Sequence, residues 1–312
     1  MKSSGIGGQA VIEGIMMKNG DAYAVAVRKE DQSIEILKDE YKLLTGKKKF
    51  LSLPLIRGVF NFIDSMVLGM KTLTWSASFF EEEDDGAEPE KEGFAKRHLS
   101  KETAEKLLMG FTVFLSICLA LGIFMVFPAF LAGLLGKLID SRLLLSAVEG
   151  LVRIVLFVLY VLLISRMEDI RRVFMYHGAE HKCINCIEHG LELNVENVRK
   201  SSKQHKRCGT SFLLFVMLVS IVLFMFIQTD TIWMRMLSRV LLIPVVAGIS
   251  YEILRLAGNS DNFVIELLSK PGLALQNLTT KEPDDDMIEV AIQAVEAVFD
   301  WKKWQAENQY GK

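Results

Sequence analysis

Two long stretches of the sequence carry no charged residue, and they constrain the fold more than any other feature. One covers the thirty residues between Lys106 and Lys137, and the other covers the twenty-two residues between Arg207 and Asp230. A helix needs about 20 apolar residues to cross the hydrocarbon core of a bilayer. Each stretch is long enough for one crossing, so we expect the chain to enter a membrane.

Two further segments are apolar but contain charges. Residues 143–165 are apolar except for Glu149 and Arg153, and residues 234–257 carry Arg235 at their start and three charges in their interior. Charges inside a membrane are costly and need partners. We expect them to pair within their own helix, and a polar groove between helices that admits a lipid headgroup or a peptide is the alternative. The three interior charges of the fourth segment are Arg239, Glu252 and Arg255.

The composition fits this segregation of apolar and charged segments. Hydrophobic residues make up 51% of the chain, and charged residues still make up 24%. The net charge of −2 argues against nucleic acid as the main partner. The first residues, MKSSGIGGQAVIEG, contain no apolar core of a signal peptide. We therefore expect the first hundred residues to form a domain of their own.

The distribution of lysine and arginine predicts the orientation. The segment 166–209 holds nine of these residues, and the two loops between the paired apolar segments are short. Cytoplasmic loops are enriched in lysine and arginine. The sequence therefore predicts four transmembrane helices in two hairpins, with both termini in the cytoplasm. In that reducing compartment the four cysteines are expected to be free thiols or metal ligands.

The parts outside the apolar segments also have recognisable patterns. Alternation over residues 10–37 predicts a three-stranded antiparallel meander with a turn at Asn19-Gly20. A helix over 53–79 carries a polar stripe and is expected to lie in the membrane interface or to be embedded in the membrane. A second amphipathic helix starts at Asp284 and is expected to dock on the first domain or on lipid headgroups. The polar stripe consists of Arg57, Asn61, Asp64 and Lys71.

These expectations divide the chain into seven parts. The fold class is an α-helical integral membrane protein with a small β-meander, an amphipathic interfacial helix and a C-terminal cytoplasmic helix. The expected parts are the meander (1–50), the interfacial helix (51–80), an acidic then basic linker (81–106), the first transmembrane hairpin (107–165), a His/Cys loop (166–209), the second hairpin (210–258) and the C-terminal region (259–312).

Residues able to bind a metal are concentrated in one short region. Four of the five histidines and three of the four cysteines lie between residues 177 and 208. His177 and His181 are four apart, so on a helix both rings project from one face and can chelate one ion. Glu180 lies beside them and could serve as a general base. The pattern H-x-x-E-H is the inverted form of a zinc-protease motif.

The second half of this region leaves two kinds of metal site open. A closed structural site would use Cys183, Cys186, His205 and Cys208, which have the spacing of a zinc ribbon. A catalytic site would use His177 and His181 with His205 or Cys208, and would keep one position open. The third possibility is that these side chains only form hydrogen bonds with neighbours.

The position of the histidines disfavours an intramembrane protease. If the second apolar helix continues straight beyond Ser165, His177 lies about 18 Å further along, in the cytosol. Cys208, in contrast, begins the third apolar stretch. The two halves can share a metal only if the chain bends at or before Gly178, so we expect a site that faces the cytoplasm.

Four motifs resemble the YqhQ family of bacterial multi-pass membrane proteins. They occur in the family's order and span nearly the whole chain. The resemblance implies a multi-pass protein of the bacterial cytoplasmic membrane and a metal-dependent enzyme. The motifs are GGQAVIEGIMM at 7–17, YHGAEHK at 176–182, HKRCGTSF at 205–212 and TTKEPDDDMIEVAI at 279–292.

The resemblance also implies a set of functional residues. It suggests that no cysteine is required at the position of Cys183, which favours a site based on histidine over the four-ligand ribbon. The implied polar set is Glu13, His177, Glu180, His181, His205 and Cys208.

Two functions follow from these patterns. The first is a metal-dependent hydrolase with Glu180 as the catalytic residue, a divalent metal, expected to be zinc, and the ligands His177, His181, His205 and Cys208. The second is a non-catalytic membrane factor, such as a helper in membrane-protein biogenesis or a scaffold, with a structural metal or none. Its basic loop would contact anionic lipid headgroups, other membrane proteins or ribosomes. A transporter is the weakest possibility because no inverted repeat is visible.

Overall fold

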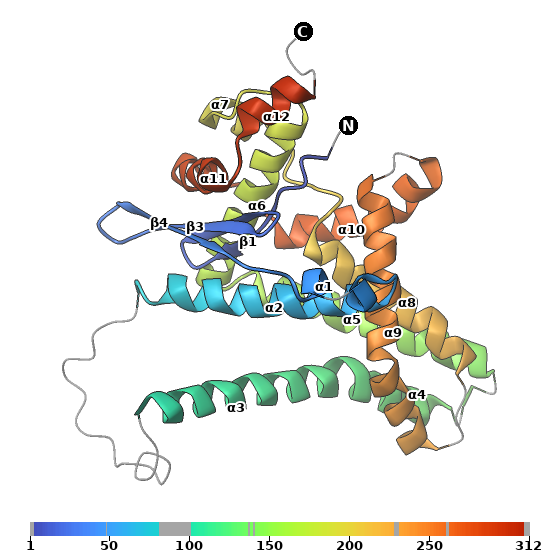
Figure 1. Cartoon of the computed structure of the whole chain (residues 1–312). Coiled ribbons are helices and arrows are strands. Elements are labelled where there is room, and N and C mark those ends of the chain that lie inside the picture. The colour runs from blue at the N-terminus through green and yellow to red at the C-terminus, as the bar shows by residue number, and fades with distance from the viewer. Residues whose placement is uncertain are drawn as a thin grey trace. The chain divides into compact units, whose positions relative to one another are not determined.

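The computed structural model describes residues 3–47, 49–80, 101–136, 138–139, 141–227, 231–259 and 262–308 (Figure 1). The chain forms two compact units. The first contains Met1–Phe80, Val158–Leu223 and Leu242–Lys312, and the second contains Glu81–Phe157 and Phe224–Leu241.

The N-terminal part forms a sheet of four antiparallel strands in sequence order, rather than the three strands expected. The expected first strand over 10–17 is split in two because Glu13 adopts a left-handed backbone conformation, with φ at 47°. Gly14 follows it, and a Cβ there would lie 2.3 Å from the carbonyl oxygen of Ala26. The strands are β1 (Gly7–Val11), β2 (Gly14–Asn19), β3 (Ala22–Arg28) and β4 (Ile34–Glu40).

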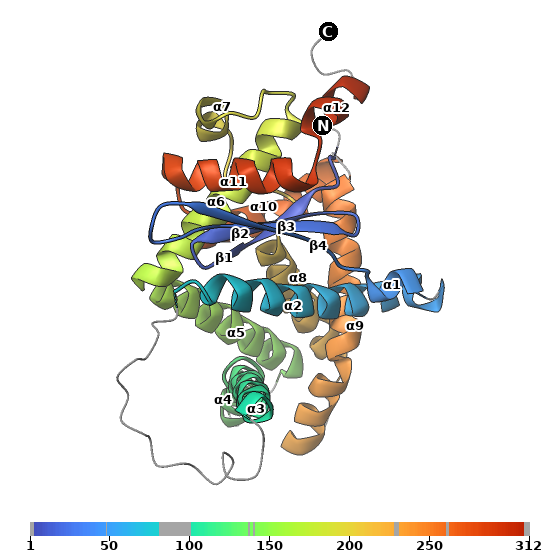
Figure 2. The same ribbon diagram turned by 60° about the vertical axis from the view of Figure 1, so that its left-hand side comes forward.

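Helices cover both faces of this sheet. Helices α6 (Glu168–Glu188) and α11 (Asp285–Val298) share a buried core with one face, which includes Ile15 and Met17. Helix α2 (Ile56–Ala77) packs on the other face through Leu68. Figure 2 shows α11, the sheet and α2 as three stacked layers of the first unit.

The C-terminal helix docks on the sheet as the sequence predicted. The side chain of Asp284 caps α11 by accepting a hydrogen bond from the backbone N–H of Met287 at 2.9 Å. Ile288 and Val295 are fully buried against the sheet and α6. The helix ends at Val298, and a short helix α12 (Trp301–Glu307) follows.

Four helical segments are long and apolar enough to cross a membrane. They correspond to the four segments that the sequence predicted: Leu107–Leu135, Leu143–Ile164, Gly209–Phe226 and Met236–Gly258. The first segment begins within α3, which itself starts at Lys101. Residues 81–100 of the expected linker lie outside the residues that the structure describes. The helices are α3 (Lys101–Leu121), a π-helical turn (Gly122–Val126), α4 (Phe127–Leu135), α5 (Arg142–Ile164), α8 (Gly209–Phe226) and α9 (Ile232–Asn259).

Four of the charges inside these segments form ion pairs. In the second unit, Arg153 contacts Glu149 within α5 at 3.1 Å, as expected, and Arg239 of α9 also contacts Glu149. In the first unit, Glu252 does not follow the expectation of pairing within its own helix. Its carboxylate accepts hydrogen bonds from the guanidinium of Arg57 in α2 at 2.7 and 2.5 Å.

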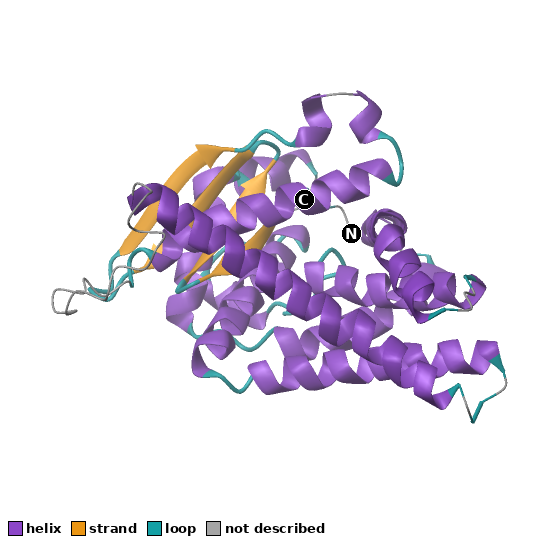
Figure 3. Ribbon diagram, turned by 90° about the horizontal axis from the view of Figure 1, so that it is seen from below, coloured by secondary structure: helices purple, strands orange, loops and turns teal. Residues whose placement is uncertain are grey.

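The remaining helices and turns connect the helices and strands described above. Figure 3 shows strands only in the one sheet, among the residues that the structure describes. The connecting elements are α1 (Leu44–Lys47), a 3-10 turn (Lys49–Ser52), α7 (Val195–Lys200) and α10 (Phe263–Thr279).

Candidate metal centre

Helix α6 is a separate helix from α5, and this break positions the histidines. Helix α5 ends at Ile164, and α6 begins at Glu168 after Met167, which has an extended backbone. The bend therefore precedes Gly178, and α6 continues through that residue without interruption. At Gly178 the segment after α10 packs directly on the helix, because a Cβ there would lie 2.0 Å from the carbonyl oxygen of Lys281.

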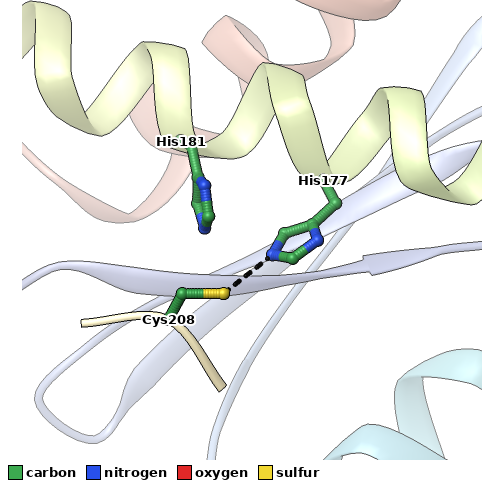
Figure 4. Close-up of side chains that lie close together, drawn as sticks. All are labelled: His177, His181 and Cys208. Atoms are coloured by element: carbon green, nitrogen blue, oxygen red, sulfur yellow. Dashed lines mark hydrogen bonds between the residues drawn. The ribbon is translucent and has the colours of Figure 1, made fainter. Parts of the chain in front are cut away.

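Three of the predicted ligands converge in the first unit. His177 and His181 project from one face of α6, and Cys208 immediately precedes α8 (Figure 4). Each residue offers one donor atom, and the three atoms lie within 4.8 Å of one another. The Nε2 atom of His177 lies 3.2 Å from the Sγ atom of Cys208. Nitrogen and sulfur ligands at about 2.0–2.3 Å from one tetrahedral ion are separated by about 3.5 Å, so this spacing fits a shared ion.

Backbone carbonyls fix the orientation of both imidazole rings. His177 Nδ1 lies 2.9 Å from the carbonyl oxygen of Thr279, and His181 Nδ1 lies 2.7 Å from that of Lys203. A carbonyl oxygen only accepts, so each Nδ1 carries the proton and donates it. Each Nε2 is then left with its lone pair, as a metal ligand requires.

Glu180 lies on the same helix between the two histidines and is 5% exposed. The backbone N–H of Gly8 in β1 donates a hydrogen bond to its carboxylate. Burial raises the pKa of Glu180 above its ordinary value, although the charge of His177 and the Gly8 hydrogen bond oppose this. A raised pKa makes a carboxylate a stronger base toward a water molecule.

These side chains line one cavity of about 290 Å³. The start of the chain forms one wall of it, from Gly5 to Gly8, and Arg207 and Gly209 form part of another. A larger cavity of about 390 Å³, lined by Lys42, Arg57 and Asn61 among others, contains no histidine or cysteine. Of these two cavities, the smaller is the one that the histidines, Glu180 and Cys208 line.

His205 lies beside the three donors without joining them. Its ring centre is 5.8 Å from that of His181, and its Nε2 lies 3.5 Å from the carboxylate of Glu188. Its Nδ1 accepts a hydrogen bond from the backbone N–H of Arg207 at 3.3 Å. Burial lowers the pKa of His205, although Glu188 opposes this. The sequence predicted His205 as a metal ligand, but in the structure its ring contacts the carboxylate of Glu188.

Glu188 is an important residue that the sequence reasoning missed. It is fully buried and forms an ion pair with Arg207, and it accepts hydrogen bonds from the backbone N–H and the hydroxyl of Ser4 at 2.7 and 2.8 Å. Burial opposes ionisation of Glu188, but the hydrogen bond from His205 and the charge of Arg207 outweigh it and hold its pKa at about 2. Glu188 thereby ties the N-terminal segment to the edge of the cavity. Its spacing of seven residues from His181 places it on the same helix face, which was a usable signal.

The structure does not bring Cys183 and Cys186 to the candidate metal centre. Both thiols are fully buried in the core shared by α6, α11 and the sheet. Cys186 donates a weak hydrogen bond to the carbonyl oxygen of Glu192, with Sγ and O 3.4 Å apart. Burial raises the pKa of Cys186 to about 11 and that of Cys183 well above its ordinary value. The zinc-ribbon arrangement is therefore not formed.

Glu13 is also separate from the metal-binding donors. Its carboxylate pairs with the guanidinium of Arg172 and lies 3.3 Å from the hydroxyl of Tyr176. Both partners are on α6. Glu13 therefore anchors the turn between β1 and β2 to the helix that carries the histidines.

Comparison with known proteins shows the family of the chain. The chain is 36% identical to the uncharacterized protein YqhQ of Bacillus subtilis (strain 168) over 306 residues, which cover 97% of this chain and 95% of that protein. No solved structure matches the chain. Residues 53–301 match the family described as "Protein of unknown function (DUF1385)". The chain therefore belongs to the DUF1385 family.

Proposed function

We propose that this chain is a multi-pass protein of the bacterial cytoplasmic membrane that acts as a metal-dependent hydrolase. His177, His181 and Cys208 would hold one divalent ion, with zinc as the expected metal. The observation that carries the proposal is the convergence of three donor atoms within 4.8 Å in a cavity that also contains Glu180.

The donor set fits zinc. Two imidazole nitrogens and one thiolate are ligands that zinc accepts in both structural and catalytic sites. Three protein ligands leave a fourth position for substrate or water, whereas structural sites use four. A bound zinc ion would supply Lewis-acid chemistry, which activates water and polarises a carbonyl or phosphoryl group.

The residues of the chain provide the other requirements of a hydrolase. Glu180 is held next to the donors by Gly8 and can take a proton from water and pass it to a leaving group. The carbonyls of Thr279 and Lys203 keep the two rings in place through the reaction. His205 would support the centre from the side of Glu188, or would become a fourth ligand if its ring turned.

The proposed centre would lie at the surface of the membrane. Cys208 is adjacent to Gly209, the first residue of an apolar segment of membrane length, whereas α6 is not such a segment. This supports a site that faces the cytoplasm, with both termini on the same side. It does not suit a protease whose chelating helix lies inside the bilayer.

The alternative of a non-catalytic factor receives less support. That function relied on a basic loop free to contact lipid headgroups or a ribosome. Several of its charges are used within the protein, because Lys182 and Lys203 contact Glu282 at 3.0 and 3.2 Å, and Arg199 pairs with Asp285. The loop is therefore partly neutralised by the C-terminal region.

A comparison of wild type with Glu180→Gln tests the proposal. Both proteins, purified in detergent and loaded with zinc, would be incubated with inner-membrane vesicles, and the released peptides and lipids would be identified by mass spectrometry. We expect about one zinc per chain in both proteins and zinc-dependent products with wild type alone. If both proteins bind zinc and release the same zinc-dependent products, Glu180 is not the general base, and if both bind zinc and neither releases products, the hydrolase proposal is wrong. If neither binds zinc in excess, the metal site is wrong.

A further inference from the structure

Helix α2 buries three polar side chains on the side that faces the sheet. Asp64, Thr72 and Ser76 are each at most 1% exposed, although a surface helix in water normally turns such residues outward. They share one side of the helix with Leu68, which packs on the sheet.

Each of these polar groups has a partner in the protein. Asp64 accepts hydrogen bonds from the hydroxyl of Tyr41 at 3.0 Å and from the backbone N–H of Leu44 at 2.8 Å. Ser76 accepts one from the backbone N–H of Ile12 at 3.2 Å. The hydroxyl of Thr72 donates to carbonyl oxygens of α2 itself. These three buried polar side chains therefore have hydrogen-bond partners without water or lipid headgroups.

The opposite side of α2 is apolar and exposed. Five large hydrophobic side chains form a continuous stripe over more than two turns, and each is between 39% and 51% exposed. Exposed apolar area costs about 25 cal/mol per Å² in water. A stripe of this size on a helix with its polar side buried indicates that something apolar covers it. The stripe consists of Phe62, Ile63, Met66, Val67 and Met70.

Helix α2 contacts two membrane-length segments, α8 near its start and α9 in its second half. A Cβ on Gly58 of α2 would lie 3.0 Å from the Cα of Gly248 in α9, so the two backbones touch. The rings of Phe62 and Phe212 are centred 5.5 Å apart, which joins α2 to the start of α8.

These contacts give the depth of α2. Phe212 lies three residues after the start of the segment Gly209–Phe226, which is about 5 Å at 1.5 Å per residue. Glu252, the partner of Arg57, lies six residues before the end of Met236–Gly258, which is about 9 Å. Gly248, which touches Gly58 in the first turn of α2, lies ten residues before that end, which is about 15 Å. Interfacial helices bury their apolar face about 5–10 Å into the boundary between headgroups and acyl chains.

We propose that α2 lies in the plane of the membrane, with the stripe from Phe62 to Met70 in contact with the acyl chains of one leaflet. The sheet then rests on the other side of α2, outside the hydrocarbon. The occupant of the stripe is lipid because α8 and α9, the helices that α2 touches, are themselves of membrane length and composition. This inference does not depend on a bound metal.

Spin labelling tests the proposal in full-length protein reconstituted into vesicles of phosphatidylethanolamine and phosphatidylglycerol. Ile63→Cys and Val67→Cys would be made in a Cys118→Ser background and labelled with a nitroxide. Lys38→Cys, on the exposed strand β4, is the matched control, and the unmodified background measures the labelling of Cys208 in the cavity and of the two core cysteines. Accessibility of each label to oxygen and to a water-soluble nickel chelate is measured by power saturation.

We expect oxygen to exceed the nickel chelate at both stripe positions and the reverse at position 38. Higher access for the chelate at both stripe positions would overturn the proposal, because the face would then be in water. Low access for both reagents with spin–spin broadening would also overturn it, because a second copy of the chain would then cover the stripe. Two labelled positions keep the test valid if one variant fails to fold.

Discussion

Helix α6 carries two pairs of residues that could bind a metal, and the structure treats them in opposite ways. His177 and His181 face the cavity, next to Cys208, and backbone carbonyls orient their rings. Cys183 and Cys186, within five residues of His181, are buried in the apolar core.

The difference follows from the helical period. His177 and His181 differ by about 40° around the helix axis, whereas Cys183 is about 200° from His181. The histidines therefore face Cys208 while Cys183 faces the sheet. Burial also raises the pKa of both core thiols, which disfavours the thiolate that a metal requires. The spacing of possible ligands in a sequence therefore indicates a metal site only when the residues also lie on the same face of their helix.

The largest expected effect comes from removing one pair or the other. His177→Ala/His181→Ala should lose essentially all bound zinc, because two of three ligands are gone. Cys183→Ala/Cys186→Ala should keep about one zinc per chain, with a lower melting temperature from the cavities left in the core. Elemental mass spectrometry of the purified proteins measures both. If only the cysteine variant lost its zinc, the metal would be bound by Cys183 and Cys186 and not by the two histidines.

A smaller effect is expected from moving the carbonyl that orients His177. Gly178→Ala places a methyl group against the carbonyl oxygen of Lys281 and should displace the neighbouring Thr279. Loss of such a supporting hydrogen bond weakens metal affinity by about 10–100-fold. Gly209→Ala is the matched control, since a Cβ at this cavity-lining position meets nothing within 4 Å. Zinc competition with a fluorescent chelator gives both affinities, and equal values would argue against the carbonyl's role.

The rate at which each cysteine reacts with a thiol reagent should distinguish Cys208 from the two core cysteines. In a Cys118→Ser background without metal, Cys208 should react with a maleimide because it lines the cavity. Zinc should slow that reaction strongly. Cys183 and Cys186 should react only after unfolding, since both are buried and their pKa values are raised. Peptide mapping of the modified cysteines measures this, and rapid labelling of Cys183 in the folded protein would contradict the structure.

The smallest effect is expected at Glu13. Glu13→Gln removes an ion pair with the half-exposed Arg172, and such pairs contribute about 0–1 kcal/mol. The free energy of unfolding should fall by no more than about 1 kcal/mol, and zinc affinity should stay unchanged. Thermal unfolding and zinc titration check the two halves. A large loss of zinc affinity would show that Glu13 is closer to the centre than the structure places it.

The sequence predicted the features that depend on local pattern. Long apolar runs, two of them without charge, predicted the four membrane-length helices, and Asp284 marked the start of α11. The i,i+4 spacing correctly placed His177 and His181 on one face. These features are set by residues close in sequence.

Features that depend on distant residues were missed or misjudged. The hydrogen bonds from Ser4 to Glu188 join residues 184 positions apart, and no local pattern indicates them. The pairing of Glu252 with Arg57 replaced the expected pairing within α9 for the same reason. The fourth strand was hidden because the left-handed Glu13 breaks a stretch whose side chains alternate like a single strand.

X-ray absorption of the zinc-loaded protein tests the central claim most directly, because it counts sulfur ligands. The structure predicts one sulfur at about 2.3 Å, two imidazole nitrogens at about 2.0 Å and one further light atom. Two or three sulfur ligands would require Cys183 or Cys186 at the metal and would contradict the arrangement described here. A shell of oxygen ligands alone would show that the zinc is bound elsewhere.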